Sequence, residues 1–207
     1  MNFDKPITRR ESIKKILRAS GGLALAGSAA FAANLTDSSP ATAATSGFLI
    51  EGVGQTPDYD IKELARKTFE TAGGISKFIS KGDVVVIKPN ISWARHPEMA
   101  ASTNPYILEA VVELCQEAGA QKVRIADNTI HDVRRCFALT GAGMVAKNTG
   151  ADLIYPRSSL MRQMRLQGSR LNVWPVFVPL VEADKVINLP IAKHHSLSTL
   201  TLGMKNW

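Results

Sequence analysis

Hydrophobic positions change their spacing several times along the chain, and the spacing distinguishes helices from strands. Apolar residues recur at helical intervals from Ile61 to Ala72, after the N-cap residue Asp60 and before Gly73. Residues 84–87 are instead a continuous β-branched run, which is typical of a strand buried on both faces. The pattern therefore predicts a helix over residues 61–72 and a central strand over residues 84–87.

The alternation of helix and strand continues toward the C-terminus. Asn104 and Pro105 begin a second helix that Gly119 ends. Residues 171–181 are rich in β-formers but contain two prolines, which indicates an edge strand or hairpin. Other expected strands are residues 48–53, 123–126, 152–155 and 185–189, and other expected helices are residues 132–139 and 143–149. This order predicts an α/β fold over residues 47–207, with a mostly parallel sheet and flanking helices.

The N-terminal segment has a different composition. Residues 1–32 carry six basic and two acidic side chains, so four of the seven net positive charges lie there. The small apolar residues that follow, 19–33, form a run shorter than the roughly 20 residues that span a bilayer. Basic residues before a short apolar run are typical of an export signal. We therefore expect a signal peptide over residues 1–32 and a flexible linker over residues 33–46, with no stable membrane span.

The pair Arg9-Arg10 resembles the motif of twin-arginine (Tat) signals. Small residues offer cleavage sites that end at Ala32 or at Ala43. The resemblance implies that the Tat translocation machinery is a partner and that the protein is periplasmic or otherwise extracytoplasmic.

Charge and cysteine content exclude some classes of function. Nucleic-acid grooves interleave basic and aromatic residues, but the arginine-rich segment has no aromatic side chain before Trp174. We expect its arginines to be solvated and no nucleic acid to bind. Cys115 and Cys136 form no iron–sulfur motif, and Cys115 lies on an apolar helix face that predicts a buried thiol. The arginines of this segment are Arg157, Arg162, Arg165 and Arg170, and we expect Arg134 and Arg135 to be solvated as well.

Polar side chains gather where the predicted strands end. Because ligands of open parallel sheets bind beyond the carboxyl ends of the strands, we expect these residues to meet at one edge. Lysine supplies positive charge for an anion, and asparagine both donates and accepts hydrogen bonds. The residues are Lys88 and Asn90 after residues 84–87, Asp127 after residues 123–126, Lys193, His194 and His195 after residues 185–189, and Lys205 and Asn206 at the end of the chain.

Three roles are open to these side chains. Lys88, Asp127 and His194 are candidates for proton transfer in catalysis. Asn90, Lys193, Lys205 and Asn206 are candidates for ligand binding, whereas Asp127, His194 and His195 could instead ligate a metal ion, the one cofactor that the sequence suggests. Asn90 and Asp127 also suit turns, and residues 196–201 resemble a helix start that could hold an anion.

Several segments together resemble the domain-of-unknown-function 362 family from about residue 48 onward. They are residues 84–90, 103–105, 117–120, 184–190 and 202–206. The resemblance implies a bacterial or archaeal protein, often with a Tat signal and in some members with a ferredoxin-like iron–sulfur domain. This chain lacks the cysteines for that redox role. In the family the motif matching Lys205-Asn206 lies inside the domain, so we expect the fold to be incomplete at its C-terminus.

The sequence therefore predicts an exported protein with an anion- or metal-dependent site at the strand ends, which binds a small anionic ligand. Two alternatives stay open. One is a non-catalytic periplasmic ligand-binding protein or redox accessory protein, and the other is a truncated, inactive fragment.

Overall fold

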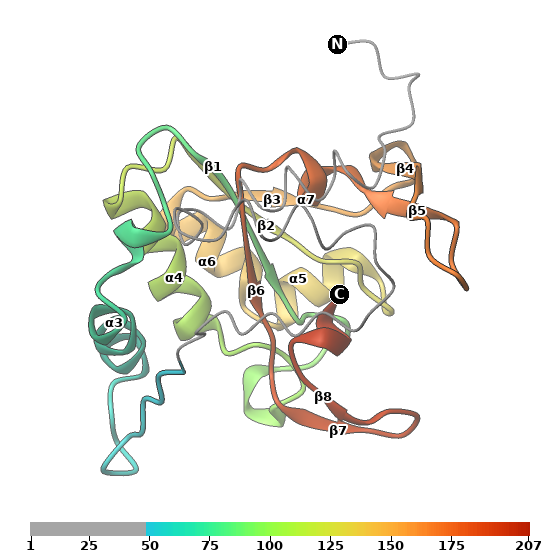
Figure 1. The fold of residues 1–207 in the computed structure, drawn as a ribbon. Helices are drawn as coiled ribbons and strands as arrows, with labels where there is room; N and C mark the ends of the chain where they lie inside the picture. The colour runs from blue at the N-terminus through green and yellow to red at the C-terminus, as the bar shows by residue number, and fades with distance from the viewer. Residues whose placement is uncertain (1–48) are drawn as a thin grey trace.

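A four-stranded parallel sheet forms the centre of the molecule (Figure 1). The computed structural model describes residues 49–207, so the predicted export signal and linker lie outside the described residues. The strand order is β3-β2-β1-β6. The strands are β1 (Val84–Pro89), β2 (Lys122–Ala126), β3 (Asp152–Ile154) and β6 (Lys185–Leu189). The predicted α/β class with a mostly parallel sheet is confirmed.

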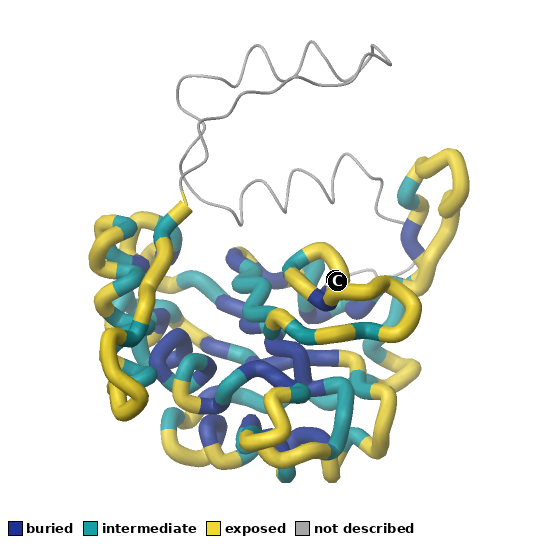
Figure 2. Tube along the Cα trace, turned by 90° about the horizontal axis from the view of Figure 1, so that it is seen from below, coloured by how far each residue is buried: buried dark blue, intermediate teal, exposed yellow. Residues whose placement is uncertain are grey.

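Helices cover one face of this sheet. Val85 and Ile87 of β1 and Ile125 of β2 lie in a buried cluster with residues of α4 (Pro105–Glu117), α5 (Val133–Leu139) and α6 (Ala142–Thr149). Helix α3 (Ile61–Thr71) packs against α4. In Figure 2 the buried residues gather at the centre of the molecule, and exposed residues line the loops around them.

A smaller layer covers the opposite face. Val86 and Ala126 point there and pack with Phe177 and Ala183. This layer contains the antiparallel pair β4 (Met161–Arg165) and β5 (Val173–Phe177), followed by the short helix α7 (Val178–Glu182). The helical face is thus a deep apolar core, whereas the second face has a much thinner cover.

Local sequence signals set the ends of the main helices. Asp60 Oδ1 accepts a hydrogen bond from Glu63 N at 3.0 Å and begins α3. Asn104 Oδ1 accepts one from Tyr106 N at 2.9 Å and begins α4. Helix α4 is followed by Gly119 at φ +89°, a left-handed conformation that glycine adopts without steric cost. Asn104, Pro105 and Gly119 therefore act as the sequence predicted.

Cys115 lies fully inside the helical core, as predicted. Burial raises the pKa of its thiol to about 12, because an apolar environment disfavours the thiolate. Cys136 is also a buried free thiol. Among residues 49–207, no helix is long and apolar enough to cross a membrane.

Three local predictions were wrong. Residues 49–53 form no strand, and Leu49 is 94 % exposed because no described strand lies beside it. Residues 178–181 belong to α7 rather than to a strand, and Pro179 occupies its first turn, where a missing N–H costs nothing. Residues 196–201 start no helix but form the turn and second strand of the hairpin β7 (Lys193–His195) and β8 (Thr199–Thr201).

Short 3-10 turns complete the fold. They are η1 (Ile75–Lys77), η2 (Pro97–Met99), η3 (Ser158–Leu160) and η4 (Met204–Asn206). The last of them places the C-terminal residues at the same end of the sheet as the β7–β8 hairpin (Figure 1).

Candidate functional site at the strand ends

The order in which the chain adds strands to the sheet reverses at β1. The chain leaves β1 for β2 and then β3 on one side, and it returns to pair β6 with the other side of β1. In open α/β sheets, ligands bind beyond the carboxyl ends of the two strands at such a switch point. The topology therefore directs attention to the ends of β1 and β6, where Lys88, Asn90 and Asn188 lie.

A buried ion pair joins the ends of β1 and β2. Lys88 Nζ lies 2.5 Å from Asp127 Oδ1, and the two side chains are 11 % and 3 % exposed. Asp127 also accepts hydrogen bonds from the backbone N–H groups of Ile91 at 2.8 Å and Asn128 at 2.9 Å. Three donors thus hold the carboxylate, which fixes the loops after both strands and orients Lys88.

Asn90 is the centre of a second set of hydrogen bonds. Its backbone N–H donates to Thr103 Oγ1 at 2.8 Å, and that hydroxyl donates to the Leu189 carbonyl at the end of β6. Its side-chain Oδ1 accepts from Lys193 Nζ at 2.9 Å. Thr103 therefore ties the β1 end to the β6 end, and Asn90 presents its amide to Lys193.

Lys193 reaches this cluster from the β7–β8 hairpin. Its ammonium donates to Asn90 Oδ1 and to the Ala101 carbonyl, and both acceptors are neutral. Burial lowers the pKa of Lys193 below its ordinary value, the Asp127 carboxylate opposes this shift, and the Lys205 ammonium adds to it. Lys193 is therefore a partly buried cation without a carboxylate of its own.

Asn206 fastens the C-terminal segment to both strands. Its Nδ2 donates to Asn188 Oδ1 at 2.8 Å and to the Lys88 carbonyl at 3.2 Å. Its Oδ1 accepts from Asn90 Nδ2 at 3.0 Å, and the residue is only 3 % exposed. This contact carries Lys205, an exposed residue, to the edge of the same cluster.

We call this group the strand-end cluster: Lys88, Asn90, Asp127, Lys193, Lys205 and Asn206. Hydrogen bonds join five of the six, and Lys205 lies close enough for its charge to act on Lys193. The cluster contains three ammonium groups and one carboxylate. It therefore has an excess of positive charge beside a low-dielectric interior, where such charge attracts an anion most strongly.

The two histidines lie differently from this prediction. His194 is exposed and adjacent to Lys193 on β7, so its side chain points to the opposite face of the strand. His195 Nδ1 accepts hydrogen bonds from Leu197 N and Ser198 N, both at 3.2 Å, and thereby stabilises the hairpin turn. Neither of these two hydrogen bonds involves Asp127.

The donor set does not fit a metal ion. Within residues 49–207 there is no group of three or more His, Cys, Asp or Glu side chains that could hold one. Asp127, His194 and His195 therefore form no such group: Asp127 accepts a hydrogen bond from Ile91 N, His195 Nδ1 accepts one from Leu197 N, and His194 is exposed.

Three polar residues of this region, Ser102, Thr103 and Asn188, were not predicted as site residues, and Thr201 was predicted only as part of an anion-binding helix start that does not form. Thr103 and Asn188 are members of the hydrogen-bond network. Ser102 and Thr201 are each 2 % exposed, and their hydroxyls have no hydrogen-bond partner among the described residues. Thr201 pairs with Lys193 across the hairpin, and Ser102 follows Ala101, which Lys193 contacts. Of these residues, only Asn188 could have been recognised from the sequence, because it is a polar residue inside an apolar strand.

Comparison with known proteins identifies the family to which the chain belongs. The sequence profile of the domain of unknown function DUF362 matches residues 85–207. A stretch of 148 residues is 32 % identical to the thylakoid-associated protein sll1697 of Synechocystis sp. (strain ATCC 27184 / PCC 6803 / Kazusa), covering 68 % of this chain and 43 % of that protein. The chain thus spans less than half the length of this relative. No solved structure matches it. Since the profile covers more than half of the sequence, including the whole strand-end cluster, the chain belongs to the DUF362 family.

Proposed function

We propose that the strand-end cluster binds a small ligand through a negatively charged group, a carboxylate or a phosphate. The observation that carries the proposal is the excess of lysine over carboxylate at the switch point of the sheet. Positive charge that is partly buried and lacks a counter-ion is destabilising, unless a ligand supplies the missing negative charge.

Each lysine retains hydrogen-bonding capacity for such a ligand. An ammonium group has three N–H donors. Lys193 uses two of them, on Asn90 and Ala101, and Lys88 uses one on Asp127 and a longer one, 3.5 Å, on the Pro89 carbonyl. The unpartnered hydroxyls of Ser102 and Thr201 would add two donors beside Lys193.

The contacts of Asp127 favour a positioning role over proton transfer. Its two oxygens accept hydrogen bonds from Lys88, Ile91 and Asn128. A carboxylate held in this way keeps Lys88 and the two loops in place, and it has little freedom to move toward a substrate. We therefore assign the cluster to ligand binding, with Lys193 as its principal contact, Lys88, Asn90, Lys205 and Asn206 as supporting residues, and no role for His194.

Titration of the full chain with inorganic phosphate or acetate tests this proposal, with ionic strength held constant and amide NMR spectra recorded. The N–H groups of Asn90 and Asn128 report on the cluster because they donate to Thr103 and Asp127. We expect saturable shifts, and an affinity at least ten-fold weaker in Lys193→Met, which corresponds to the loss of about 1.4 kcal/mol.

Lys122→Met is the matched control, because Lys122 forms an exposed ion pair with Asp152 at the start of β2. It should bind as the wild type does. Equal affinity in wild type and Lys193→Met, or shifts that never saturate, would refute the proposal.

We further propose that the chain is exported by the Tat machinery to the periplasm or an equivalent compartment. The basis is the arginine pair Arg9-Arg10 before a short apolar run. The relative's name associates that protein with thylakoids, which are membranes but do not define the compartment of this chain. Replacement of both arginines by lysine should abolish translocation, and unchanged export would exclude the Tat route.

A further inference from the structure

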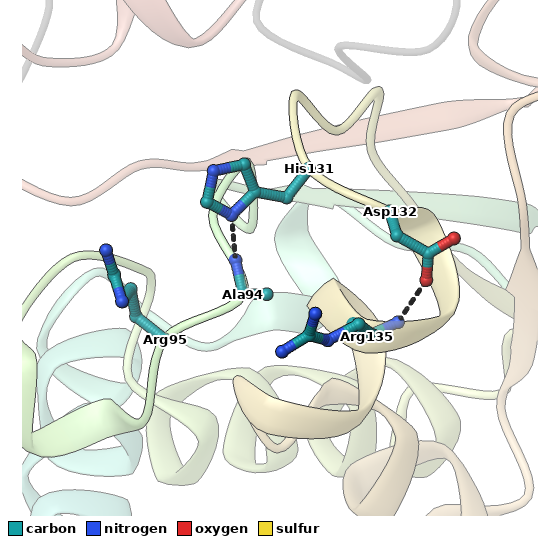
Figure 3. Close-up of a pocket in the computed structure, with 5 residues that line it drawn as sticks. All are labelled: Ala94, Arg95, His131, Asp132 and Arg135. Carbon is teal, nitrogen blue, oxygen red and sulfur yellow. Dashed lines mark hydrogen bonds between the residues drawn. The ribbon is translucent and has the colours of Figure 1, made fainter.

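A pocket outside the strand-end cluster lies between the loops that follow β1 and β2. Its volume is about 340 Å³, and it is lined by Ala94, Arg95, His131, Asp132 and Arg135 (Figure 3). Pockets of this size accept small molecules. Arg95 comes from the loop after β1, whereas His131 and Asp132 come from the loop after β2 and Arg135 from α5.

Hydrogen bonds lock the two loops together. The Ser92 carbonyl accepts from Ile130 N at 3.0 Å and from His131 N at 3.1 Å. In the opposite direction, Ala94 N donates to His131 Nδ1 at 3.3 Å (Figure 3). The His131 ring also packs edge-on against Trp93, with ring centroids 4.7 Å apart. The pocket is therefore built on a fixed frame.

These contacts leave one edge of His131 available. Because Nδ1 accepts the hydrogen bond from Ala94, the neutral imidazole carries its proton on Nε2. That N–H lies on the side of the ring that faces away from Ala94 (Figure 3).

The arginines supply charge that the pocket does not balance. Among residues 49–207, neither Arg95 nor Arg135 forms an ion pair, and both are exposed. Asp132 is the one carboxylate that lines the pocket, and its Oδ1 accepts from Arg135 N at 2.9 Å. Arg134, the neighbour of Arg135, is engaged differently, since its guanidinium lies over the Tyr155 ring at 5.9 Å.

We propose that this pocket is an oxyanion site, in which Arg95 and Arg135 bind a carboxylate or phosphate group and His131 holds the Ala94 side of the frame. Guanidinium groups donate two parallel N–H bonds to such groups, which gives them a geometric preference that lysine lacks. The site differs in residues and in chemistry from the strand-end cluster, so its occupancy does not depend on that of the lysines.

The arginine side chains themselves can report on binding. In the full chain, the Nε–Hε resonances of Arg95 and Arg135 should shift saturably with inorganic phosphate at constant ionic strength, and a second titration with acetate tests the carboxylate. Tighter binding of phosphate assigns the site to phosphate groups, and equal or tighter binding of acetate assigns it to carboxylates. Exposed charge pairs contribute up to about 1 kcal/mol each, or roughly five-fold in affinity.

Two variants and one control complete the test. Arg95→Gln with Arg135→Gln should weaken binding roughly ten-fold, measured on the amides of Ala94 and His131, and Arg134→Gln should leave it unchanged. Lys193→Met should also leave it unchanged, which separates this site from the proposed lysine site. Unsaturable shifts with both anions, wild-type affinity in the double variant, or equal loss in Arg134→Gln would overturn the proposal.

Discussion

Two groups of charged residues in this protein are built in opposite ways. On the helical side, Lys62 and Arg66 of α3 face three glutamates of α4, and every side chain has an oppositely charged partner within 3.2 Å. The strand-end cluster has three lysines and one carboxylate, that of Asp127, which forms an ion pair with Lys88. The glutamates are Glu109, Glu113 and Glu117.

This difference in charge balance indicates a structural role for the α3–α4 ion pairs and a functional role for the strand-end cluster. The α3–α4 pairs neutralise each other, and the partners of Arg66 hold its charge so firmly that its pKa rises, chiefly through its hydrogen bonds to Glu117 and Glu113. In contrast, burial lowers the pKa of Lys193, whose hydrogen-bond partners are neutral. Charge that is balanced joins two helices, whereas charge that is unbalanced and partly buried is suited to a ligand.

The largest expected effect comes from removing the carboxylate of the strand-end cluster. Asp127→Asn leaves Lys88 partly buried without its counter-ion and should lower the free energy of unfolding by about 3 kcal/mol. Urea denaturation at pH 7 measures this loss. Asp152→Asn, at an exposed ion pair with Lys122, is the control and should cost less than about 1 kcal/mol. If both variants lost a similarly small free energy of unfolding, the buried pair would stabilise the fold no more than an exposed one.

Removing the amide that fastens the C-terminal segment should have the next largest effect. Asn206→Ala breaks the hydrogen bonds to Asn90, which is buried, and to Asn188, which is partly buried, and leaves Asn90 Nδ2 and Asn188 Oδ1 without these partners. We expect a loss of about 2 kcal/mol in the same urea experiment. Asn148→Ala removes one exposed hydrogen bond to Glu109 and should be nearly neutral. A neutral Asn206→Ala would show that the segment is not held by this residue.

The smallest effect is expected on the helical side, and it should depend on pH. Burial alone would raise the pKa of Glu113, but hydrogen bonds from Lys62 and Arg66 outweigh it and lower the pKa below 4.5. The pairs therefore stabilise the fold above the unfolded pKa, and this contribution is lost as the pH falls through the folded value.

Glu113→Gln should accordingly cost about 0.5–1 kcal/mol at pH 7 and progressively less in acid. Urea midpoints of wild type and variant, compared from pH 7 to pH 3, measure this convergence. A difference that is constant across this range would exclude an electrostatic origin.

The sequence predicted elements well where the signal is local. The cap at Asn104, the proline after it and the glycine at 119 fix α4, and a continuous β-branched run fixes β1. It failed where strand pairing rather than local composition decides the structure. Residues 196–201 have the composition of a helix start, but residues 199–201 pair with β7 and the others form the turn.

The candidate site was predictable to a similar extent and for the same reason. Lys88, Asn90 and Asp127 follow strands, and parallel strands end at one edge of a sheet, so their meeting could be predicted from the strand pattern. Ser102, Thr103 and Thr201 carry no such signal, because their place depends on a loop and a hairpin that fold back onto the sheet. His194 was misplaced because β7 turns its side chain to the opposite face from Lys193.

The pKa of Lys193 tests the central claim most directly. It can be followed through the side-chain Cε resonance of protein labelled with ¹³C-lysine, with and without saturating phosphate. The account predicts a titration midpoint below that of ordinary lysines in the free protein, a further decrease in Asp127→Asn, and a rise when phosphate binds. Anion affinity should fall as the pH rises through this midpoint, because the neutral amine attracts no anion. An ordinary midpoint that neither Asp127→Asn nor phosphate moves would contradict the account.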